Sequence, residues 1–160
     1  MLKIITLPTK SLRERSKEIE VSFLKTATAK KLIKEMVPIM YAADGIGLAA
    51  PQVNHNIRLC VIGKEATPNK KQDLILVNPE WEKLSRKTAW DTEGCLSVPK
   101  LFGKVKRYTK IKVQALDESG KTLNFVAQDF FARVIQHEVD HLNGILFIDK
   151  AKDIFEAKQE

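Results

Sequence analysis

The run His-Glu-Val-Asp-His at 137–141 contains two metal-binding side chains and an acid within little more than one helical turn. Residues four apart project from the same face of a helix, so His137 and His141 could bind one ion. Glu138 would then lie beside the ion, where a general base for an activated water belongs. A chance match on an exposed amphipathic helix is the alternative, because short motifs of this kind recur without function.

A metal used for hydrolysis usually has three protein ligands and one open position, so a third ligand is needed. His55 lies in a polar, turn-like segment and is expected to be solvated. Cys60 lies in the apolar run 57–62, which predicts a strand with a buried thiol. Cys95 lies in the segment 92–99, among glycine, polar residues and proline, and is the better candidate ligand.

The chain resembles the peptide deformylases in three separate segments, which occur in the order that the family has. These segments are Gly45-Ile46-Gly47-Leu48-Ala49-Ala50-Pro51-Gln52, Glu93-Gly94-Cys95-Leu96-Ser97 and Gln136-His137-Glu138-Val139-Asp140-His141-Leu142-Asn143-Gly144. The resemblance covers essentially residues 1–150. It implies a metal-dependent hydrolase that removes the formyl group from formyl-methionine at the amino terminus of newly made polypeptides and releases formate.

The resemblance also implies a role for individual residues. Cys95, His137 and His141 would bind the metal, and Glu138 would move the proton. The carboxamide of Gln52 and the backbone N–H of Leu96 would stabilise the oxyanion, and such donors are typically worth about 3 kcal/mol of barrier each. Gln52 as an exposed loop amide is the alternative for that residue. The metal would be ferrous iron in cells, with zinc, nickel or cobalt as substitutes, because thiolate and imidazole accept all four.

Substrate contacts are expected from two segments. Gly45, Ile46 and Gly47 allow a peptide to approach the backbone closely and to add as a strand. Phe130 and Val134, with Leu96, are expected to line an apolar pocket for methionine. Arg133 has two open interpretations: its methylene stem covers the pocket mouth, or the side chain faces solvent.

One residue departs from the family pattern. Phe102 occupies the position where some members have an arginine, so recognition of the peptide backbone by an arginine is not carried over to this chain. The nearest arginine is Arg107, which is expected to pair with Glu93 and to brace the segment that contains the ligand cysteine.

Periodicity predicts an α+β domain over 1–160, with antiparallel β-sheets wrapped around a central helix that bears the motif. Helices are expected at about 128–143, ending before Gly144, and at 26–43, where Pro38 should interrupt or kink the helix. A short terminal helix is expected after Asp149. Strands are expected at 57–62, 73–77, 83–90, 110–117 and 121–126, the last two joined as a hairpin at 117–120.

Composition favours a cytoplasmic globular enzyme. The hydrophobic content is 44% and the charged content 29%, with no long apolar span for a membrane and no signal-peptide pattern. The two cysteines are assigned to a metal and to the core, which leaves no disulfide framework and indicates a reducing compartment.

The net charge of +7 raises the question of nucleic-acid binding. A basic stretch free of acids contains Lys100, Lys104, Lys106, Arg107, Lys110 and Lys112. A solvated lysine-rich face is favoured, because no aromatic residues are interleaved and no binding motif is present. Sequence-specific nucleic-acid binding is therefore not expected. The resemblance makes a weak, salt-sensitive contact with the ribosome surface plausible.

Two other protein classes share part of this pattern. A zinc endopeptidase has the His-Glu-x-x-His helix, but it usually takes a histidine or a glutamate as third ligand. A copper electron carrier uses two histidines and a cysteine, but is expected to have an axial methionine and no base.

Overall fold

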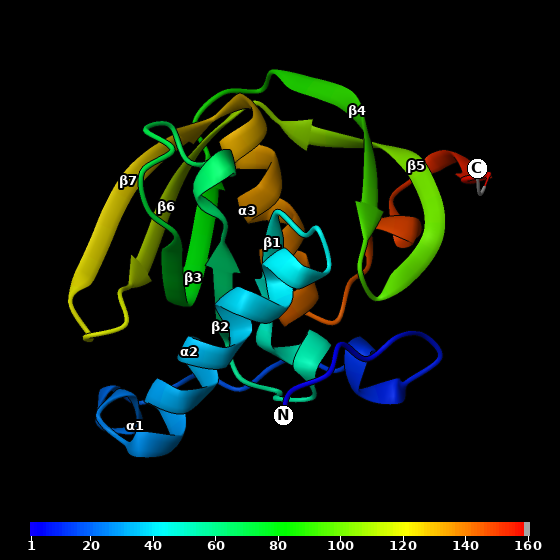
Figure 1. The fold of residues 1–160 in the computed structure, drawn as a ribbon. Helices are drawn as coiled ribbons and strands as arrows, with labels where there is room; N and C mark the ends of the chain where they lie inside the picture. The colour runs from blue at the N-terminus through cyan, green and yellow to red at the C-terminus, as the bar shows by residue number, and fades with distance from the viewer. Residues whose placement is uncertain (159–160) are drawn as a thin grey trace.

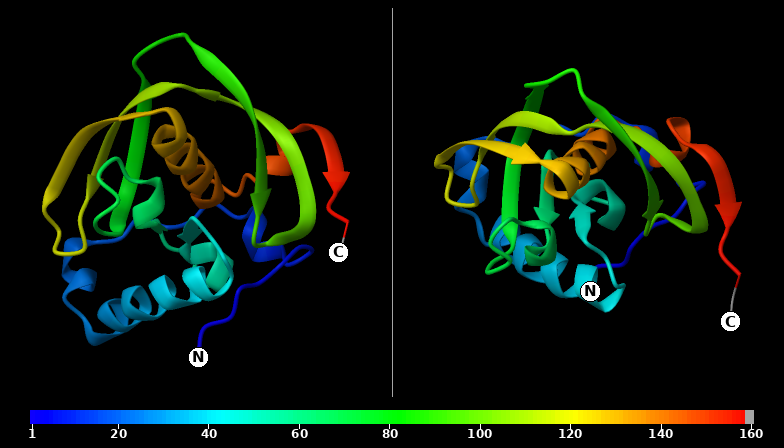
Figure 2. Two further views of the ribbon diagram at one scale, coloured as in Figure 1. Left: turned by 45° about the horizontal axis from the view of Figure 1, so that its top comes forward. Right: turned by 90° about the horizontal axis from the view of Figure 1, so that it is seen from above.

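The computed structural model describes residues 1–158. Helix α3 (Asp129–Leu142) lies between two antiparallel sheets, with the larger sheet on one side and the smaller arching over it (Figures 1 and 2). The expected α+β fold class is confirmed. The larger sheet has the order β1-β2-β3-β6-β7, with β1 (Gly47–Ala49), β2 (Leu59–Ile62), β3 (Leu74–Lys83), β6 (Lys110–Leu116) and β7 (Thr122–Gln128). The smaller sheet has the order β4-β5-β8, with β4 (Thr88–Cys95), β5 (Val98–Tyr108) and β8 (Lys152–Glu156).

The other helical elements are short, except for one. They are α1 (Val21–Leu24), α2 (Ala27–Ala42) and the 3-10 turns η1 (Lys10–Arg13), η2 (Ala50–Val53), η3 (Lys64–Ala66) and η4 (Phe147–Asp149). Helix α2 packs its apolar face against β1, β2 and β3. Among residues 1–158, no helix combines the length and the apolar character needed to cross a membrane.

Helix α3 is buried on nearly all sides. Its apolar residues Phe131, Ile135 and Leu142 belong to the core beneath the larger sheet. Full burial of each such side chain contributes about 1.5–3 kcal/mol, so packing rather than helix propensity holds α3 in place. The helix ends as predicted, with Gly144 at a φ of 74°, a conformation that glycine adopts without strain. This packing carries the polar motif residues of α3 into the interior.

Helix α2 runs through Pro38, so the expected interruption is wrong. Proline removes the hydrogen bond to the carbonyl four residues earlier, at Lys34. Both Pro38 and Lys34 are exposed, and water can therefore satisfy that carbonyl. Thr26 caps the helix by accepting a hydrogen bond from the backbone N–H of Ala29 at 3.2 Å.

The expected strand at 83–90 is wrong, because the turn 84–87 divides it between β3 and β4. Strand β5 was not expected at all. Its lysines at 104 and 106 face outward, whereas Val105 and Arg107, which alternate with them, are buried. This is the alternation of a half-buried strand. Because the inward residue Arg107 is also basic, the sequence around it shows a basic stretch and not an alternation of polar and apolar residues.

The expected terminal helix after Asp149 is also wrong. The chain forms the 3-10 turn η4 up to Asp149 and then strand β8, which pairs antiparallel with β5. Pairing with β5 gives the backbone of this segment hydrogen-bond partners that sequence periodicity does not reveal. The end of the described chain is thereby fixed against the smaller sheet.

Candidate active site

Two elements far apart in the sequence bring three metal-binding side chains together. Cys95 lies at the end of β4, and His137 and His141 lie on one face of α3. The Sγ atom of Cys95 is 3.2 Å from Nε2 of His141, and one ligand atom from each of the three residues lies within 4.8 Å of the others. No other group of three or more such side chains converges in this way within residues 1–158.

The three donors fit a divalent transition metal. A thiolate and two imidazoles are the ligand types preferred by iron, zinc, nickel and cobalt. His141 is 1% exposed, and burial lowers the pKa of its imidazole well below the usual value, which favours the neutral form that binds metals. The distances leave room for one ion between the sulfur and the two rings.

A tight turn positions the cysteine. Cys95 pairs with Val98 across a two-residue connection formed by Leu96 and Ser97, so β4 and β5 form a hairpin that ends at the metal site. The Leu96 side chain packs against Gly45, where an added Cβ would lie 2.7 Å from Leu96 Cδ1. The ligand turn and the glycine-containing segment therefore fit directly against each other.

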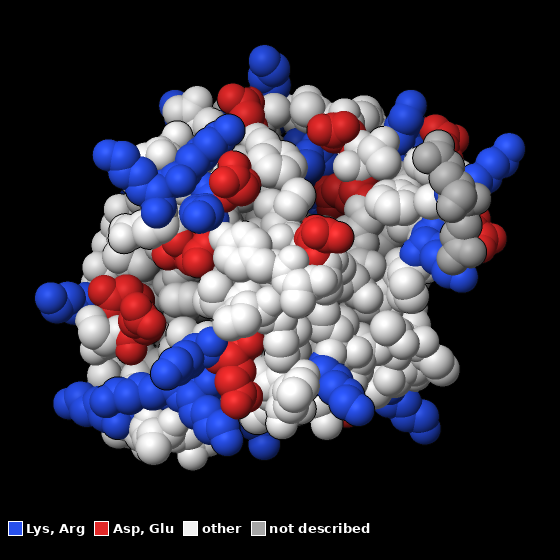
Figure 3. All heavy atoms as spheres, viewed as in Figure 1, with Lys and Arg blue, Asp and Glu red and all other residues white. Residues whose placement is uncertain are grey.

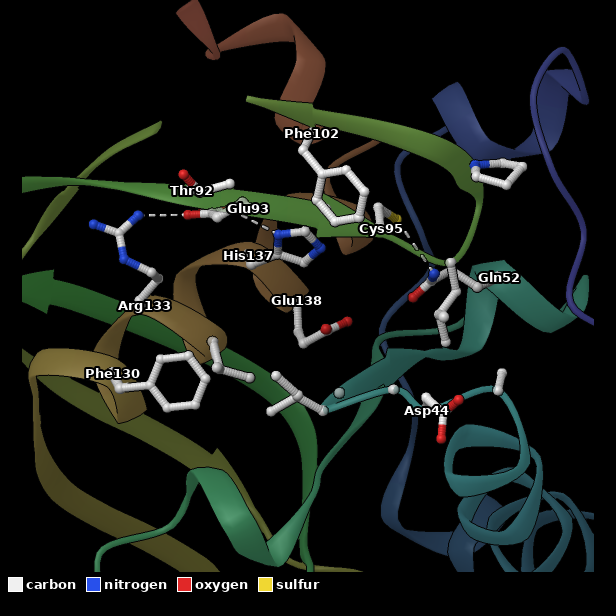
Figure 4. Close-up of a pocket in the computed structure, with 18 of the residues that line it drawn as sticks. Asp44, Gln52, Thr92, Glu93, Cys95, Phe102, Phe130, Arg133, His137 and Glu138 are labelled. Atoms are coloured by element: carbon white, nitrogen blue, oxygen red, sulfur yellow. Dashed lines mark hydrogen bonds and ion pairs between the residues drawn. The ribbon is translucent and has the colours of Figure 1, made fainter. Parts of the chain in front are cut away.

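Gln52 is buried beside this turn, which excludes the exposed-loop interpretation. Its Oε1 accepts a hydrogen bond from the N–H of Ala49 at 2.9 Å, which fixes the carboxamide orientation. Its Nε2 donates towards Ser97 Oγ at 3.2 Å and Cys95 Sγ at 3.6 Å. The carboxamide N–H group therefore faces the metal site, as Figure 4 shows.

Glu138 is 3% exposed, and its carboxylate points into the pocket (Figure 4). Its Oε2 is buried and has no hydrogen-bond partner among the described residues. Burial raises the pKa of this carboxyl to about 7. Gly47 makes room for the group, since a Cβ there would lie 2.5 Å from Glu138 Oε1. The site thus contains a carboxyl group whose pKa lies near neutral pH.

A buried network centred on Glu93 orients His137. Arg107 donates to Glu93 through Nε at 2.9 Å and Nη2 at 2.8 Å, which confirms the expected pairing. Oε1 of Glu93 also lies 2.8 Å from Nδ1 of His137. A carboxylate at Nδ1 holds the ring with Nε2 directed towards the metal, the usual arrangement around ligand histidines. The network extends to Asp140, which accepts from Arg107 Nη1 at 2.6 Å.

The charges in this network compensate one another. Burial would raise the pKa of Glu93, but hydrogen bonds from Arg107 and His137 outweigh it and hold the pKa well below its usual value. Burial likewise lowers the pKa of His137, but hydrogen bonds with Cys95 and Glu93 raise it to about 10. A metal cation binds the neutral form of an imidazole.

Arg133 points inward, so the interpretation that it faces solvent is wrong. The side chain is 7% exposed and donates from Nη1 to Glu93 Oε2 at 2.6 Å and to the Val105 carbonyl at 2.9 Å. Nη2 donates to the carbonyl of Ala89 at 2.8 Å. The guanidinium therefore ties α3 to β4 and β5, while the residue still lines the pocket.

A cavity of about 450 Å³ opens over these groups. It is lined by Gly45, Ile46, Gly47, Gln52, Glu93, Cys95, Leu96, Phe102, Phe130, Arg133, Val134, His137 and Glu138, among others. One side is bordered by β1, which lies at the edge of the larger sheet and, within residues 1–158, pairs only with β2. The site residues predicted from sequence are thus brought together around this cavity. His141 is buried and does not appear among its lining residues.

Comparison with known proteins agrees with this site. The family model described as polypeptide deformylase matches residues 1–156. The chain belongs to the peptide deformylase family. It is 47% identical over 139 residues to peptide deformylase 1 of Clostridium acetobutylicum, covering 87% of each chain. It is 43% identical over 152 residues to the chloroplastic peptide deformylase 1B of tomato, covering 95% of this chain and 53% of the longer tomato protein.

Solved deformylase structures share the fold. A class I type b peptide deformylase from Acinetobacter baumannii with Met-Ala-Ser bound superposes with a TM-score of 0.86, at 33% identity over 94% of this chain and 98% of that one. The peptide deformylase of Thermotoga maritima has a TM-score of 0.86 at 35% identity, over 95% and 98% of the two chains. Membership of this family makes the chain a hydrolase of N-formyl groups, and it rules out the endopeptidase and copper-carrier alternatives.

Two features of this deformylase site were not predicted from sequence. The contact between Glu93 and His137 and the inward position of Arg133 both depend on partners about 40 residues away. The only sequence signal is strand alternation, which would place Glu93, Val105 and Arg107 on the same inner face once β4 and β5 are aligned.

Proposed function

We propose that this deformylase binds one divalent metal ion through Cys95, His137 and His141, and that Glu138, Gln52 and Leu96 act on the formyl group beside it. The observation that carries the proposal is the meeting of three donor atoms with an unpartnered carboxylate in one cavity. A bound divalent ion would polarise the formyl carbonyl and lower the pKa of a water molecule. The proposed native ion is ferrous iron, with zinc, nickel and cobalt as substitutes.

Glu138, Gln52 and Leu96 have different roles in the proposed reaction. Glu138 accepts a proton from the attacking water and later donates it to the departing nitrogen, a role suited to its pKa of about 7. A new C–O bond forms, the formyl C–N bond breaks, and formate and a free amino terminus result. The Nε2 group of Gln52 and the backbone N–H of Leu96 donate hydrogen bonds to the carbonyl oxygen as it becomes negative.

The substrate is proposed to be the formyl-methionyl end of a newly synthesised polypeptide. Its backbone would lie along Gly45, Ile46 and Gly47, the segment that leads into β1 (Gly47–Ala49). The methionine side chain would occupy the apolar part of the cavity next to Phe130 and Val134. The Acinetobacter baumannii relative was solved with Met-Ala-Ser bound, which supports a substrate that begins with methionine.

Removal of the metal is expected to abolish deformylation. Treatment with a chelator should lower formate release from formyl-Met-Ala-Ser by about 10³-fold, because a Lewis acid supplies several kcal/mol of transition-state stabilisation. Ferrous iron, nickel, cobalt or zinc should restore it, with formate and metal content measured on the same samples. The iron form should lose activity in air, through oxidation of the ion or of Cys95.

An acetylated peptide of the same sequence is the matched control. Undiminished formate release from a sample with no measurable metal would contradict the proposed metal requirement. Cleavage of internal peptide bonds, with no formate released, would contradict the proposed substrate.

A cytoplasmic location is proposed for this chain. Cys60 and Cys95 are both free thiols, and Cys60 is fully buried in β2 as expected. A thiolate metal ligand remains intact most readily in a reducing compartment.

A weak contact with ribosomal RNA is also proposed. Contrary to the expectation of no interleaved aromatic residue, Trp90 on β4 lies among the lysines of the smaller sheet and is 45% exposed. Nζ of Lys152 is 3.9 Å from the ring centroid of Trp90, and Nζ of Lys106 is 5.7 Å away. On the face seen in Figure 3, lysines and arginines lie mainly toward the periphery, and the centre holds uncharged residues together with several acidic ones.

Ribosome binding should be salt-sensitive and should depend on this lysine group, defined as Lys104, Lys106 and Lys152. Three phosphate contacts would weaken binding by about 10- to 50-fold between about 50 and 200 mM salt. Co-sedimentation with ribosomes measures this. The triple change of the group to glutamate should remove the salt dependence. The charge-matched control changes Lys25, Lys30 and Lys34, at and near α2, to glutamate. Binding that is equal at both salt concentrations would contradict the proposal.

A further inference from the structure

Strand β8 braces the part of β5 that borders the cavity. Its register pairs Phe155 with Phe102 and Glu156 with Leu101. Just beyond the strand, the N–H of Ala157 donates to the carbonyl of Lys100 at 2.8 Å. The last described segment of the chain therefore supports residues 100–104 of β5.

Phe102 forms part of the cavity wall next to the metal site. It lies opposite Gly94 in the β4–β5 register, and a Cβ on Gly94 would lie 2.6 Å from Phe102 Cε1. The ring therefore lies directly against the backbone that leads into Cys95. Figure 4 shows Phe102 above Cys95 and His137, whereas Phe130 lies on the other side of His137. The Phe102 side of the cavity is thus separate from the side proposed for methionine.

Phe155 packs on the same ring from the opposite strand. The two ring centroids are 5.8 Å apart, and the planes meet at 25°, a stacked arrangement. Phe155 is 51% exposed, so it gains less from burial than a core residue does. Pairs of this kind contribute about 0.5–1.5 kcal/mol beyond the area they bury. The pair leaves Phe102 with Gly94 on one neighbouring strand and Phe155 on the other.

We propose that Phe155 is a positioning residue, which holds Phe102 in the cavity wall as a surface for the part of the formylated peptide beyond the methionine. The inference rests on the proposed function. Without the Phe155 ring, the Phe102 side chain is free to turn towards solvent. The wall on the β5 side is then lost, while the metal ligands, Glu138 and the methionine side of the cavity are unchanged.

The test compares a short and a longer substrate. In Phe155→Ala, KM for formyl-Met-Ala-Ser should rise by about 2- to 10-fold, the factor that corresponds to the energy of an aromatic pair. The kcat for this peptide, and both constants for formyl-Met-amide, should stay within about 2-fold. Phe155→Trp, which restores a ring, should return KM for the tripeptide to the wild-type value.

Ile154→Ala is the matched control. Ile154 is the exposed neighbour on β8, and it borders Gly103 rather than the Phe102 ring. The Ile154→Ala change should leave KM for both substrates unchanged. Thermal unfolding should show that Phe155→Ala and Ile154→Ala both fold. Equal KM values for Phe155→Ala and wild type would overturn the proposal, as would an equal rise for both substrates or the same effect from Ile154→Ala. A wild-type protein that releases no formate from either substrate would instead overturn the proposed function.

Discussion

Replacing Glu138 with glutamine is expected to lower kcat for formyl-Met-Ala-Ser by about 10²–10⁴-fold. Glutamine keeps the shape of the side chain beside Gly47, but it can neither accept a proton from water nor donate one to the leaving nitrogen. The three donor atoms of Cys95, His137 and His141 are untouched, so bound metal should stay near one equivalent. Formate release and metal analysis on the same preparation measure both quantities.

A matched acid-to-amide change away from the cavity is Glu118→Gln, in the β6–β7 connection, and it should leave kcat unchanged. The proposed role of Glu138 fails if Glu138→Gln keeps wild-type turnover with its metal in place. Loss of the metal together with activity would show that Glu138 acts on metal retention instead.

The second large effect is expected for Glu93→Ala, which removes the centre of the buried charge network. Arg107 and Arg133 would keep their positive charges at 4% and 7% exposure without their main partner. Breaking a buried pair in this way costs about 3–5 kcal/mol, or a fall in Tm of roughly 6–20 °C for a chain of this size. Metal affinity should fall by about 10- to 100-fold as well, because His137 loses the group that orients it.

Thermal unfolding and competition with a metal-binding dye measure the two effects. The control is Glu35→Ala, since Glu35 pairs with Lys31 at 4.0 Å on the surface of α2. A surface pair of this kind contributes less than about 1 kcal/mol. Unchanged Tm and unchanged metal affinity in Glu93→Ala would mean that the network neither stabilises the fold nor orients the ligand.

The parts of the site that could be predicted from sequence are those encoded by local spacing. His137 and His141 are one helical turn apart, so their convergence needs only the helix to form. Cys95 was identified by contrast with Cys60, whose apolar surroundings marked it as a core thiol. Three other features depend on strands that meet only in the folded chain. They are the pairing of β8 with β5, the inward position of Arg133 and the hydrogen bond between His137 and Glu93. Local sequence carries little information about such partners.

The same distinction explains the fold. Strands β6 and β7 and helices α2 and α3 show apolar periodicity, and β2 is a continuous apolar run, so the sequence predicts these elements to within a few residues. Strand β5 was missed because Arg107 replaces an apolar residue on its inner face, and the reason for that arginine is the carboxylate of Glu93. Strand β8 was missed because all five of its residues are exposed, so it lacks the buried face that periodicity detects.

The open edge of β1 has a further consequence for turnover. An unpaired strand edge normally invites other chains to add and can lead to aggregation. Here the strand is three residues long, from Gly47 to Ala49, so an incoming chain can form only a few main-chain hydrogen bonds before the edge ends. The end of a peptide can bind beside β1, but the strand is too short for further chains to add and extend the sheet. In the proposed binding mode, the shortness of β1 limits the main-chain hydrogen bonds to the product, which would let the finished polypeptide dissociate and free the cavity.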